Sequence, residues 1–215
     1  AVWCCCFKDD DDADASDEMS TTCAAAIKAF EQKSGENAAE AKIVKLYGQI
    51  PPITKLDASL NNLTNCEHLQ LSTNSIDKIS VALTGLKNLR ILSMGRNVIK
   101  KIERLDDLAE SLCELWMSYN QVASLDGLSG LTNLTTLYLS NNLIKNFAEL
   151  DKIASLPNLK DVLFYGNPMY DGLSTQEARI EVLKRLPNVA KIDGSMVLQS
   201  DRDQASASAA EPASE

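Results

Sequence analysis

Histidine is nearly absent from this 215-residue chain, which contains only one, His68. Metal centres need clustered histidine, cysteine or carboxylate ligands, and no cluster here has the spacing of a zinc site. One histidine without a nucleophile elbow makes no catalytic triad, and no glycine-rich loop leads into the lysine of a phosphate-binding loop. The sequence therefore predicts no enzyme, no metal and no cofactor, and His68 is interpreted as an ordinary surface residue.

Long apolar runs, a basic excess and spaced cysteine pairs are also missing. The apolar runs fall far short of the ~18 residues that span a bilayer, so no membrane contact is predicted. The net charge is −9, although residues 1–18 alone hold seven acids and one lysine. This balance argues against a nucleic-acid binder, which usually has a basic face. Three of the six cysteines are adjacent and no CxxC occurs, so reduced thiols in the cytoplasm are expected.

The chain instead contains a repeat. In each copy two apolar residues alternate around an outward residue, and an asparagine follows three positions after the second. The copies are Leu69–Ile76, Leu92–Ile99, Leu115–Val122, Leu137–Ile144 and Val162–Pro168. Their asparagines, at spacings of 22 to 25 residues, are Asn74, Asn97, Asn120, Asn142 and Asn167. This spacing is the signature of leucine-rich repeats.

A leucine-rich repeat supplies one short strand and a return path, and it buries its leucines only against its neighbours. The predicted fold class is therefore α/β: a solenoid of about six repeats of 22–25 residues, with a parallel sheet on its concave face and helical caps at both ends. Strands are expected near 44–49, 67–72, 90–95, 113–118, 135–140 and 160–165. In the degenerate first copy, Leu46 and Gly48 take the strand positions and Pro51 takes the asparagine position. The asparagines are expected to satisfy backbone groups that each turn leaves unpaired.

The repeats set the predicted division of the chain. Its parts are a disordered acidic extension (1–18), an N-terminal helical cap (19–42), the repeats (43–170), a C-terminal cap (171–199) and a disordered tail (200–215). The extension is interpreted alternatively as lying outside the native protein, with Met19 as the true start. In the first cap, Thr21 or Thr22 is the N-cap of a helix over 23–33, which Ser34-Gly35 ends. The tail is rich in alanine, serine and glutamate without apolar periodicity, which is typical of disorder.

Outward residues of successive strands form rows, because side chains alternate along a strand and neighbouring strands lie ~4.8 Å apart. The outward position between the two apolar residues of each copy, together with the outward positions that flank them, is rich in aromatic and apolar residues. This pattern predicts a partner-binding stripe of Tyr47, Ile91, Trp116, Tyr138, Leu163 and Tyr165. Each aromatic ring offers roughly 150–250 Å² of buriable surface, and exposed patches of several hundred Å² mark interaction sites. The alternative is that a terminal helix covers the stripe.

Two stretches within the repeats, Leu89–Glu103 and Leu115–Leu125, closely resemble the axonemal dynein light chain 1 family. Gly48–Ile53 and Leu69–Asn74 also look like that family, and Arg179–Gly194 resembles its C-terminal cap. The resemblance covers about residues 21–204. It implies a non-catalytic light chain of the outer dynein arm, located in the cytoskeleton of a cilium or flagellum. It further implies association with a dynein heavy chain near its microtubule-binding region, and control of ciliary beating.

The C-terminal cap is also basic. The residues concerned are Arg179, Lys184, Arg185, Lys191 and Arg202. One hypothesis is that they face the acidic surface of tubulin in the microtubule; the other is that they serve solubility. Two further function classes stay open from the sequence: an A-prime-like adaptor of a spliceosomal ribonucleoprotein, which has a similar cap, and a phosphatase regulator. Occurrence only in ciliated organisms would favour dynein.

Overall fold

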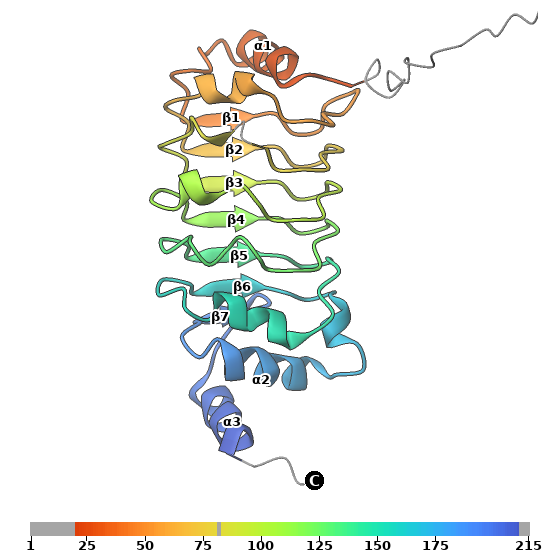
Figure 1. The fold of residues 1–215 in the computed structure, drawn as a ribbon, viewed down its shortest axis with the longest axis vertical. Helices are drawn as coiled ribbons and strands as arrows, with labels where there is room; N and C mark the ends of the chain where they lie inside the picture. Colours follow the sequence, from red (N-terminus) through yellow and green to blue (C-terminus); the bar gives the residue numbers. More distant parts are fainter. Residues whose placement is uncertain (1–19, 81–82, 211–215) are drawn as a thin grey trace, which may run out of the picture.

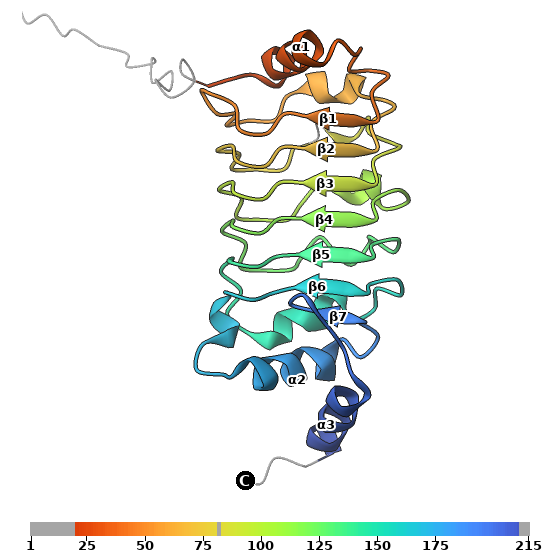
Figure 2. The same cartoon turned by 180° about the vertical axis from the view of Figure 1, so that it is seen from behind.

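In the computed structural model, which describes residues 20–80 and 83–210, eight strands form one sheet in chain order. The first seven run parallel, and the last pairs antiparallel to the seventh. The strands are β1 (Ile43–Lys45), β2 (His68–Gln70), β3 (Ile91–Ser93), β4 (Glu114–Trp116), β5 (Thr136–Tyr138), β6 (Asp161–Leu163), β7 (Lys191–Ile192) and β8 (Ser195–Met196). Figures 1 and 2 show β1 to β6 stacked along the long axis, one in each coil. The leucine-rich-repeat solenoid predicted from the sequence is confirmed.

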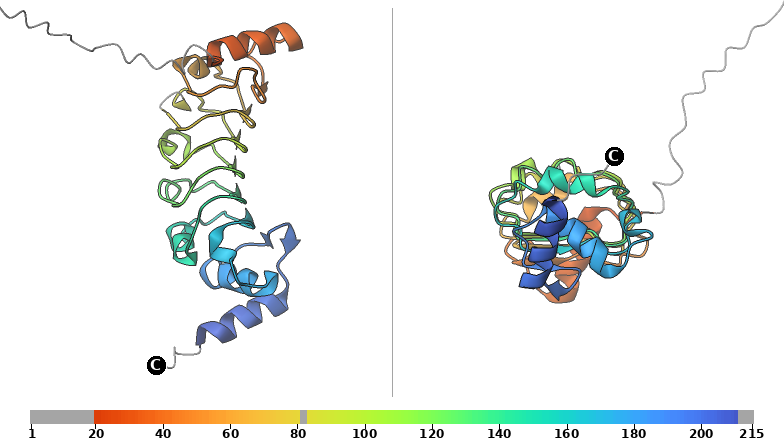
Figure 3. Two further views of the ribbon diagram at one scale, coloured as in Figure 1. Left: turned by 90° about the vertical axis from the view of Figure 1, so that its right-hand side faces the viewer. Right: turned by 90° about the horizontal axis from the view of Figure 1, so that it is seen from below.

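The core lies between the sheet and the return segments. In the repeat strands, the middle residue points inward and its leucine is fully buried in β2 to β5. Several returns contain short 3₁₀ helices, at Ala58–Asn62, Asp106–Leu108, Phe147–Ile153 and Pro168–Tyr170. These helices bury Leu60, Leu108 and Leu150 against the strand leucines. Figure 3 shows the strands lining the hollow side of the solenoid, opposite the helical returns.

The first repeat differs from its predicted register. Val44 pairs with Leu69, so β1 begins before the predicted start and Lys45 occupies the position expected for Tyr47. The return is nevertheless in the predicted register, because the Ile53 N–H donates to Asn74 as the Ile76 N–H donates to Asn97. The turn of the first coil therefore contains two more residues than the turn that follows β2. This insertion carries Tyr47 beyond the end of the strand.

The N-terminal cap is a helix, α1 (Cys23–Ser34), as the sequence predicts. The Thr22 hydroxyl accepts a hydrogen bond from the Ala25 N–H at its start. Gly35 ends it with a φ of 75°, a left-handed conformation that favours glycine. Cys23 and Ala26 lie on the buried face of this helix, which closes the first coil.

The C-terminal end is more ordered than predicted. Helix α2 (Thr175–Arg185) starts with a capping box formed by Ser174 and Glu177, and the hairpin of β7 and β8 extends the sheet. The prediction of a disordered tail is wrong for residues 200–210, because Gln199–Ala210 forms helix α3. This helix packs against α2, buries Ala205, and contributes Asp201 to a buried ion pair. Its contact face is small and polar, so it shows no apolar periodicity.

Candidate docking surface

The middle of the predicted stripe is continuous in the structure. Trp116 and Tyr138 occupy paired positions on β4 and β5, and their rings stack with centroids 6.0 Å apart and an interplanar angle of 23°. Tyr138 pairs in turn with Leu163 on β6. All three side chains are half-buried. Helix α3 lies beyond β7 at the C-terminal end (Figure 1), so it does not cover these strands.

Carboxylates hold the polar atoms of both rings. The Trp116 Nε1–H donates to Glu114 Oε2 at 3.1 Å, and the Tyr138 hydroxyl donates to Asp161 Oδ2 at 3.0 Å. Burial, and then the bond to Asp161, raises the pKa of Tyr138, so its hydroxyl is protonated at neutral pH. Rings that are fixed before binding lose less conformational freedom when a partner covers them.

The strand alternation places both carboxylates at outward positions, but the sequence alone did not assign them this role. Glu114 stands two residues before Trp116 and therefore emerges on the same side of the strand. That spacing is a signal that the sequence does contain. The pairing of Tyr138 with Asp161 connects neighbouring strands, and Lys191 Nζ reaches the same carboxylate at 3.0 Å. Such a network between strands depends on the three-dimensional register.

His68 belongs to this surface, which corrects its interpretation as an ordinary surface residue. Its ring meets Trp116 edge-on, with centroids 5.7 Å apart and an interplanar angle of 73°. Its Nε2 lies 2.9 Å from the Ser93 hydroxyl. Burial lowers the pKa of His68, so the ring is neutral at physiological pH. His68 therefore extends the apolar surface of Trp116 toward the N-terminal strands.

The remaining members of the predicted stripe lie around this centre. Ile91 is half-buried and pairs with His68 on the neighbouring strand. Tyr165 follows β6 and is 65% exposed. Tyr47 is 53% exposed beside the N-terminal cap, away from the row that contains Trp116. The structure thus brings Trp116, Tyr138 and Leu163 together, places Ile91 and Tyr165 at their margins, and separates Tyr47 from them.

The asparagine ladder lies inside the solenoid, in the structural role expected from the sequence. Asn97 Oδ1 accepts from the Ile76 N–H at 3.0 Å, and its Nδ2 donates to the carbonyls of Leu71 and Met94. The same pattern recurs at Asn74, Asn120, Asn142 and Asn167. Each asparagine side chain therefore connects its own coil to the preceding one by hydrogen bonds, and its polar atoms are not directed at a partner.

Arg179, one of the basic cap residues, is buried within the cap itself. It pairs with Asp201 at 2.9 Å and donates to the carbonyls of Ile192 and Ser195. Only 10% of its side chain is exposed. The prediction that Arg179 faces a microtubule is therefore wrong. Its apparent place in a basic cluster came from sequence proximity, whereas its charge serves to attach α3 and the hairpin to α2.

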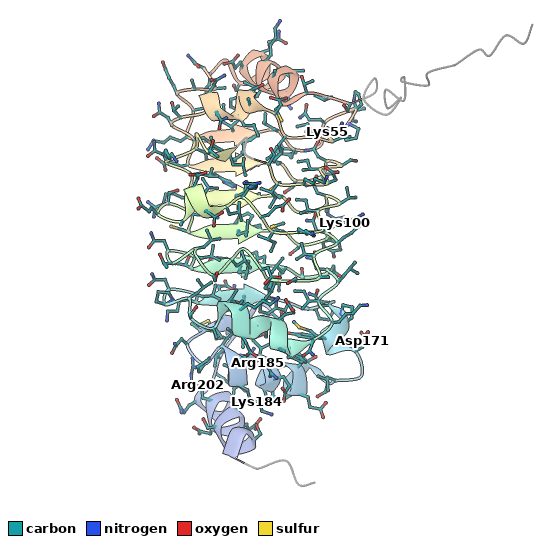
Figure 4. All side chains as sticks on the ribbon, viewed as in Figure 1. Lys55, Lys100, Asp171, Lys184, Arg185 and Arg202 are labelled. Atoms are coloured by element: carbon teal, nitrogen blue, oxygen red, sulfur yellow. The ribbon has the colours of Figure 1, made fainter. Side chains whose placement is uncertain are left out.

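The other four basic cap residues lie at the surface with partners of their own. Lys184 pairs with Glu181 at 2.6 Å, and Arg185 pairs with the same carboxylate at 3.0 Å. Lys191 pairs with Asp161, and Arg202 donates to the Pro187 and Val189 carbonyls. Figure 4 places the labelled Lys184, Arg185 and Arg202 at the C-terminal end of the solenoid. Part of the local positive charge is thus balanced within the chain.

Buried thiols and carboxylates form no evident chemical centre in the described part of the chain. Burial raises the pKa of Cys23 and of Cys66 to about 11, so both thiols stay protonated at neutral pH. Across residues 20–80 and 83–210, no three His, Cys, Asp or Glu side chains are placed to hold a metal ion. No helix in these ranges is long and apolar enough to cross a membrane.

Comparisons with known sequences agree with this architecture. The family described as Leucine Rich repeats (2 copies) matches residues 110–152. Dynein axonemal light chain 1 of Chlamydomonas reinhardtii is 53% identical over 190 residues, which cover 86% of this chain and 96% of that protein. The protein of the same name from Homo sapiens is 48% identical over 186 residues, covering 86% of this chain and 97% of that one.

Solved structures show the same fold. An internalin from Listeria monocytogenes is similar with a TM-score of 0.54 and 26% identity, covering 68% of this chain and 39% of that chain. The Drosophila melanogaster SNF/U2A′ complex contains a chain with a TM-score of 0.58 and 20% identity, covering 72% of this chain and 92% of that chain. At 20% identity, the second similarity concerns the fold alone.

Proposed function

The chain belongs to the dynein axonemal light chain 1 family, and from this premise we propose that it is a non-catalytic subunit of an outer-arm axonemal dynein. In this proposal it docks on a dynein heavy chain near the microtubule-binding region and regulates the beating of a cilium or flagellum. Its place is then the cytoplasm, on the axonemal cytoskeleton, and its partner is a protein, neither a nucleic acid nor a membrane. The observation that carries the proposal is the stacked, accessible pair of Trp116 and Tyr138.

Interface energetics support this assignment. Tryptophan and tyrosine are the residue types that most often dominate binding energy when a partner buries them. Here their polar atoms already have partners within the chain, so a partner can cover the rings without leaving a buried donor unpaired. Both rings lie outside the leucine core, so they can be removed with little effect on folding.

The test is Trp116→Ala, measured for binding to the purified motor domain of the heavy chain and for thermal melting. Loss of a central interface tryptophan should cost roughly 2–4 kcal/mol, or about 30- to 1,000-fold in affinity. Tyr119→Ala is the matched control, because Tyr119 is 49% exposed on the turn after β4, outside the stripe. Normal melting with lost binding supports the proposal. Normal binding by Trp116→Ala contradicts it.

The alternative classes have less support. The likeness to the SNF/U2A′ complex is confined to the fold, whereas the dynein light chains are similar along nearly their whole length. No feature of the described residues favours a phosphatase regulator over a dynein subunit.

With Arg179 buried, four basic residues remain at the surface of the C-terminal cap. We propose that the four surface cations of the cap, Lys184, Arg185, Lys191 and Arg202, face the acidic surface of tubulin once the motor is docked. Lys184 and Arg185 pair with Glu181, and Arg185 also pairs with Asp151 at 3.7 Å. Arg202 donates to backbone carbonyls, which do not neutralise its charge, so it leaves a positive charge at this end. The contact would be electrostatic and would weaken as salt screens it.

A further inference from the structure

A cleft of about 820 Å³ separates α1 from the outward side of β1. Phe30 and Lys33 line it from the helix, and Ile43, Lys45 and Tyr47 line it from the strand and the turn that follows. The left view of Figure 3 shows α1 lying across the end of the solenoid and projecting past the face that carries the strands. The helix therefore forms a wall at the N-terminal edge of the sheet face.

The cleft combines exposed apolar surface with positive charge. Ile43 and Tyr47 are 47% and 53% exposed. Three lysines and one glutamate line the cleft in the described part of the chain. Lys42 is paired with Glu67 at 2.9 Å, whereas Lys33 and Lys45 have no acidic partner among the described residues. These two ammonium groups are available to an anionic group of a ligand.

The cleft continues the docking surface. Ile43 pairs with His68 in the sheet, and His68 contacts Trp116. In the row of outward positions that contains Trp116, the residue on β1 is Lys45, followed by the polar Gln70 and Ser93. The surface therefore changes along the solenoid axis, from cationic under α1, through small polar residues, to aromatic on β4 and β5.

We propose that the cleft under α1 is a carboxylate-binding subsite of this docking surface. It receives an acidic part of the same partner segment whose apolar side chains cover Trp116 and Tyr138. The inference rests on the proposed function. It adds that the partner segment carries an acidic group, and that this group lies toward α1 when the apolar side chains cover Trp116 and Tyr138. A protein segment that is acidic only at the end that enters the cleft fits better than a nucleic acid, which is charged along its whole length. Glu114 and Asp161 flank the aromatic pair and would repel further phosphates there.

The strand spacing sets the reach of the partner segment. Lys45 and Trp116 stand on β1 and β4, three strand intervals apart, or about 14 Å at the usual ~4.8 Å per interval. An α-helix rises ~1.5 Å per residue. A partner helix lying along the solenoid axis would therefore carry its Asp or Glu about nine or ten residues from its apolar anchor.

The test is the double substitution Lys33→Glu plus Lys45→Glu, with binding to the purified heavy-chain motor domain measured over a range of salt concentrations. Reversing both charges should lower the association rate by about tenfold or more at low salt. The difference from the unmodified chain should shrink as salt screens the contact. Lys78→Glu plus Lys101→Glu is the matched control, since both residues are exposed on other coils, and it should bind as the unmodified chain does.

The outcomes separate this inference from the proposed function. If the Lys33/Lys45 variant keeps its binding and salt dependence while Trp116→Ala is defective, the carboxylate-binding subsite is refuted and the proposed function is not. Normal binding by Trp116→Ala would overturn the docking surface itself. Equal losses in the Lys33/Lys45 variant and the Lys78/Lys101 control would show a general charge effect, and so reject a specific subsite. Thermal melting of each variant checks that the fold is intact.

Discussion

Replacing Asn97 by alanine tests the physical basis of the fold. Asn97 is 7% exposed, and its amide makes three short hydrogen bonds: from the Ile76 N–H at 3.0 Å, to the Leu71 carbonyl at 3.1 Å and to the Met94 carbonyl at 3.0 Å. The two carbonyls do not depend on Asn97 alone. Leu71 also accepts from Asn74, and Met94 also accepts from Asn120.

The cost of Asn97→Ala therefore comes mainly from one group. The Ile76 N–H loses its partner inside the coil, and an unsatisfied buried donor costs about 1–3 kcal/mol. Each kcal/mol lowers the melting temperature of a chain of this size by about 2–4 °C. Asn167→Ala should cost more, because it removes the donor to the Phe164 carbonyl as well as the acceptor for the Ile144 N–H.

The assay is urea unfolding followed by circular dichroism, with Asn133→Ala as the control. Asn133 also bonds to the preceding coil, donating to the Glu110 carbonyl at 2.8 Å, but it does so at the surface. Water can replace that bond, so its loss should stay within about 0.5 kcal/mol. If Asn97→Ala destabilises the protein no more than Asn133→Ala, the inner ladder does not satisfy otherwise unpaired groups and the reasoning is refuted.

Three further predictions concern the two ends. Asp201→Asn should release α3, because Arg179 then keeps an unbalanced buried charge; hydrogen exchange over residues 199–208 should speed up, while protection in β2 to β5 is retained. The N–H of Leu198, and then Arg179, lowers the pKa of Asp201, so its contribution is complete above the ordinary carboxyl pKa and is lost as the pH falls through the lowered value. Exchange of α3 should therefore accelerate in acid, and an acid-insensitive α3 would contradict the ion pair. Deleting residues 1–18 should leave melting and motor-domain binding unchanged, because the two caps and the repeats between them all lie within residues 20–210; a melting temperature lower by several degrees would show that the segment belongs to the fold. Lys184→Glu plus Arg185→Glu should weaken co-sedimentation of the motor-domain complex with microtubules, and an unaffected complex would remove the tubulin contact.

The repeats were predictable because the spacing of the repeated residues in the sequence equals the number of residues in one coil. Every asparagine marks the same turn, so the strands around Leu69, Leu92, Leu115 and Leu137 follow at once. The register of β1 was not predictable in this way. Its turn contains two extra residues, and two placements of the apolar positions fit the sequence equally well until the pairing of Val44 with Leu69 decides between them.

The elements at the C-terminal end were harder to predict because they have no periodic apolar pattern. β7 and β8 have two residues each, too few for a periodic pattern. Helix α3 packs through Ala205 and an ion pair instead of leucines. At the docking surface, the alternation of side chains was enough to locate Trp116 and Tyr138. The role of His68 could not be predicted in this way, because its contact with Trp116 depends on the spatial arrangement of the coils and on the side-chain conformations.

Because each repeat coil contributes one strand, positions along the solenoid axis are separated by whole numbers of strand intervals. The cleft beneath α1 and the pair of aromatic rings are separated by a whole number of coils, so their separation can change only in steps of ~4.8 Å, the width of one strand. A longer or shorter turn, like the one after β1, moves residues at the rim without altering that distance. Any change of spacing to match another partner would require the gain or loss of an entire repeat.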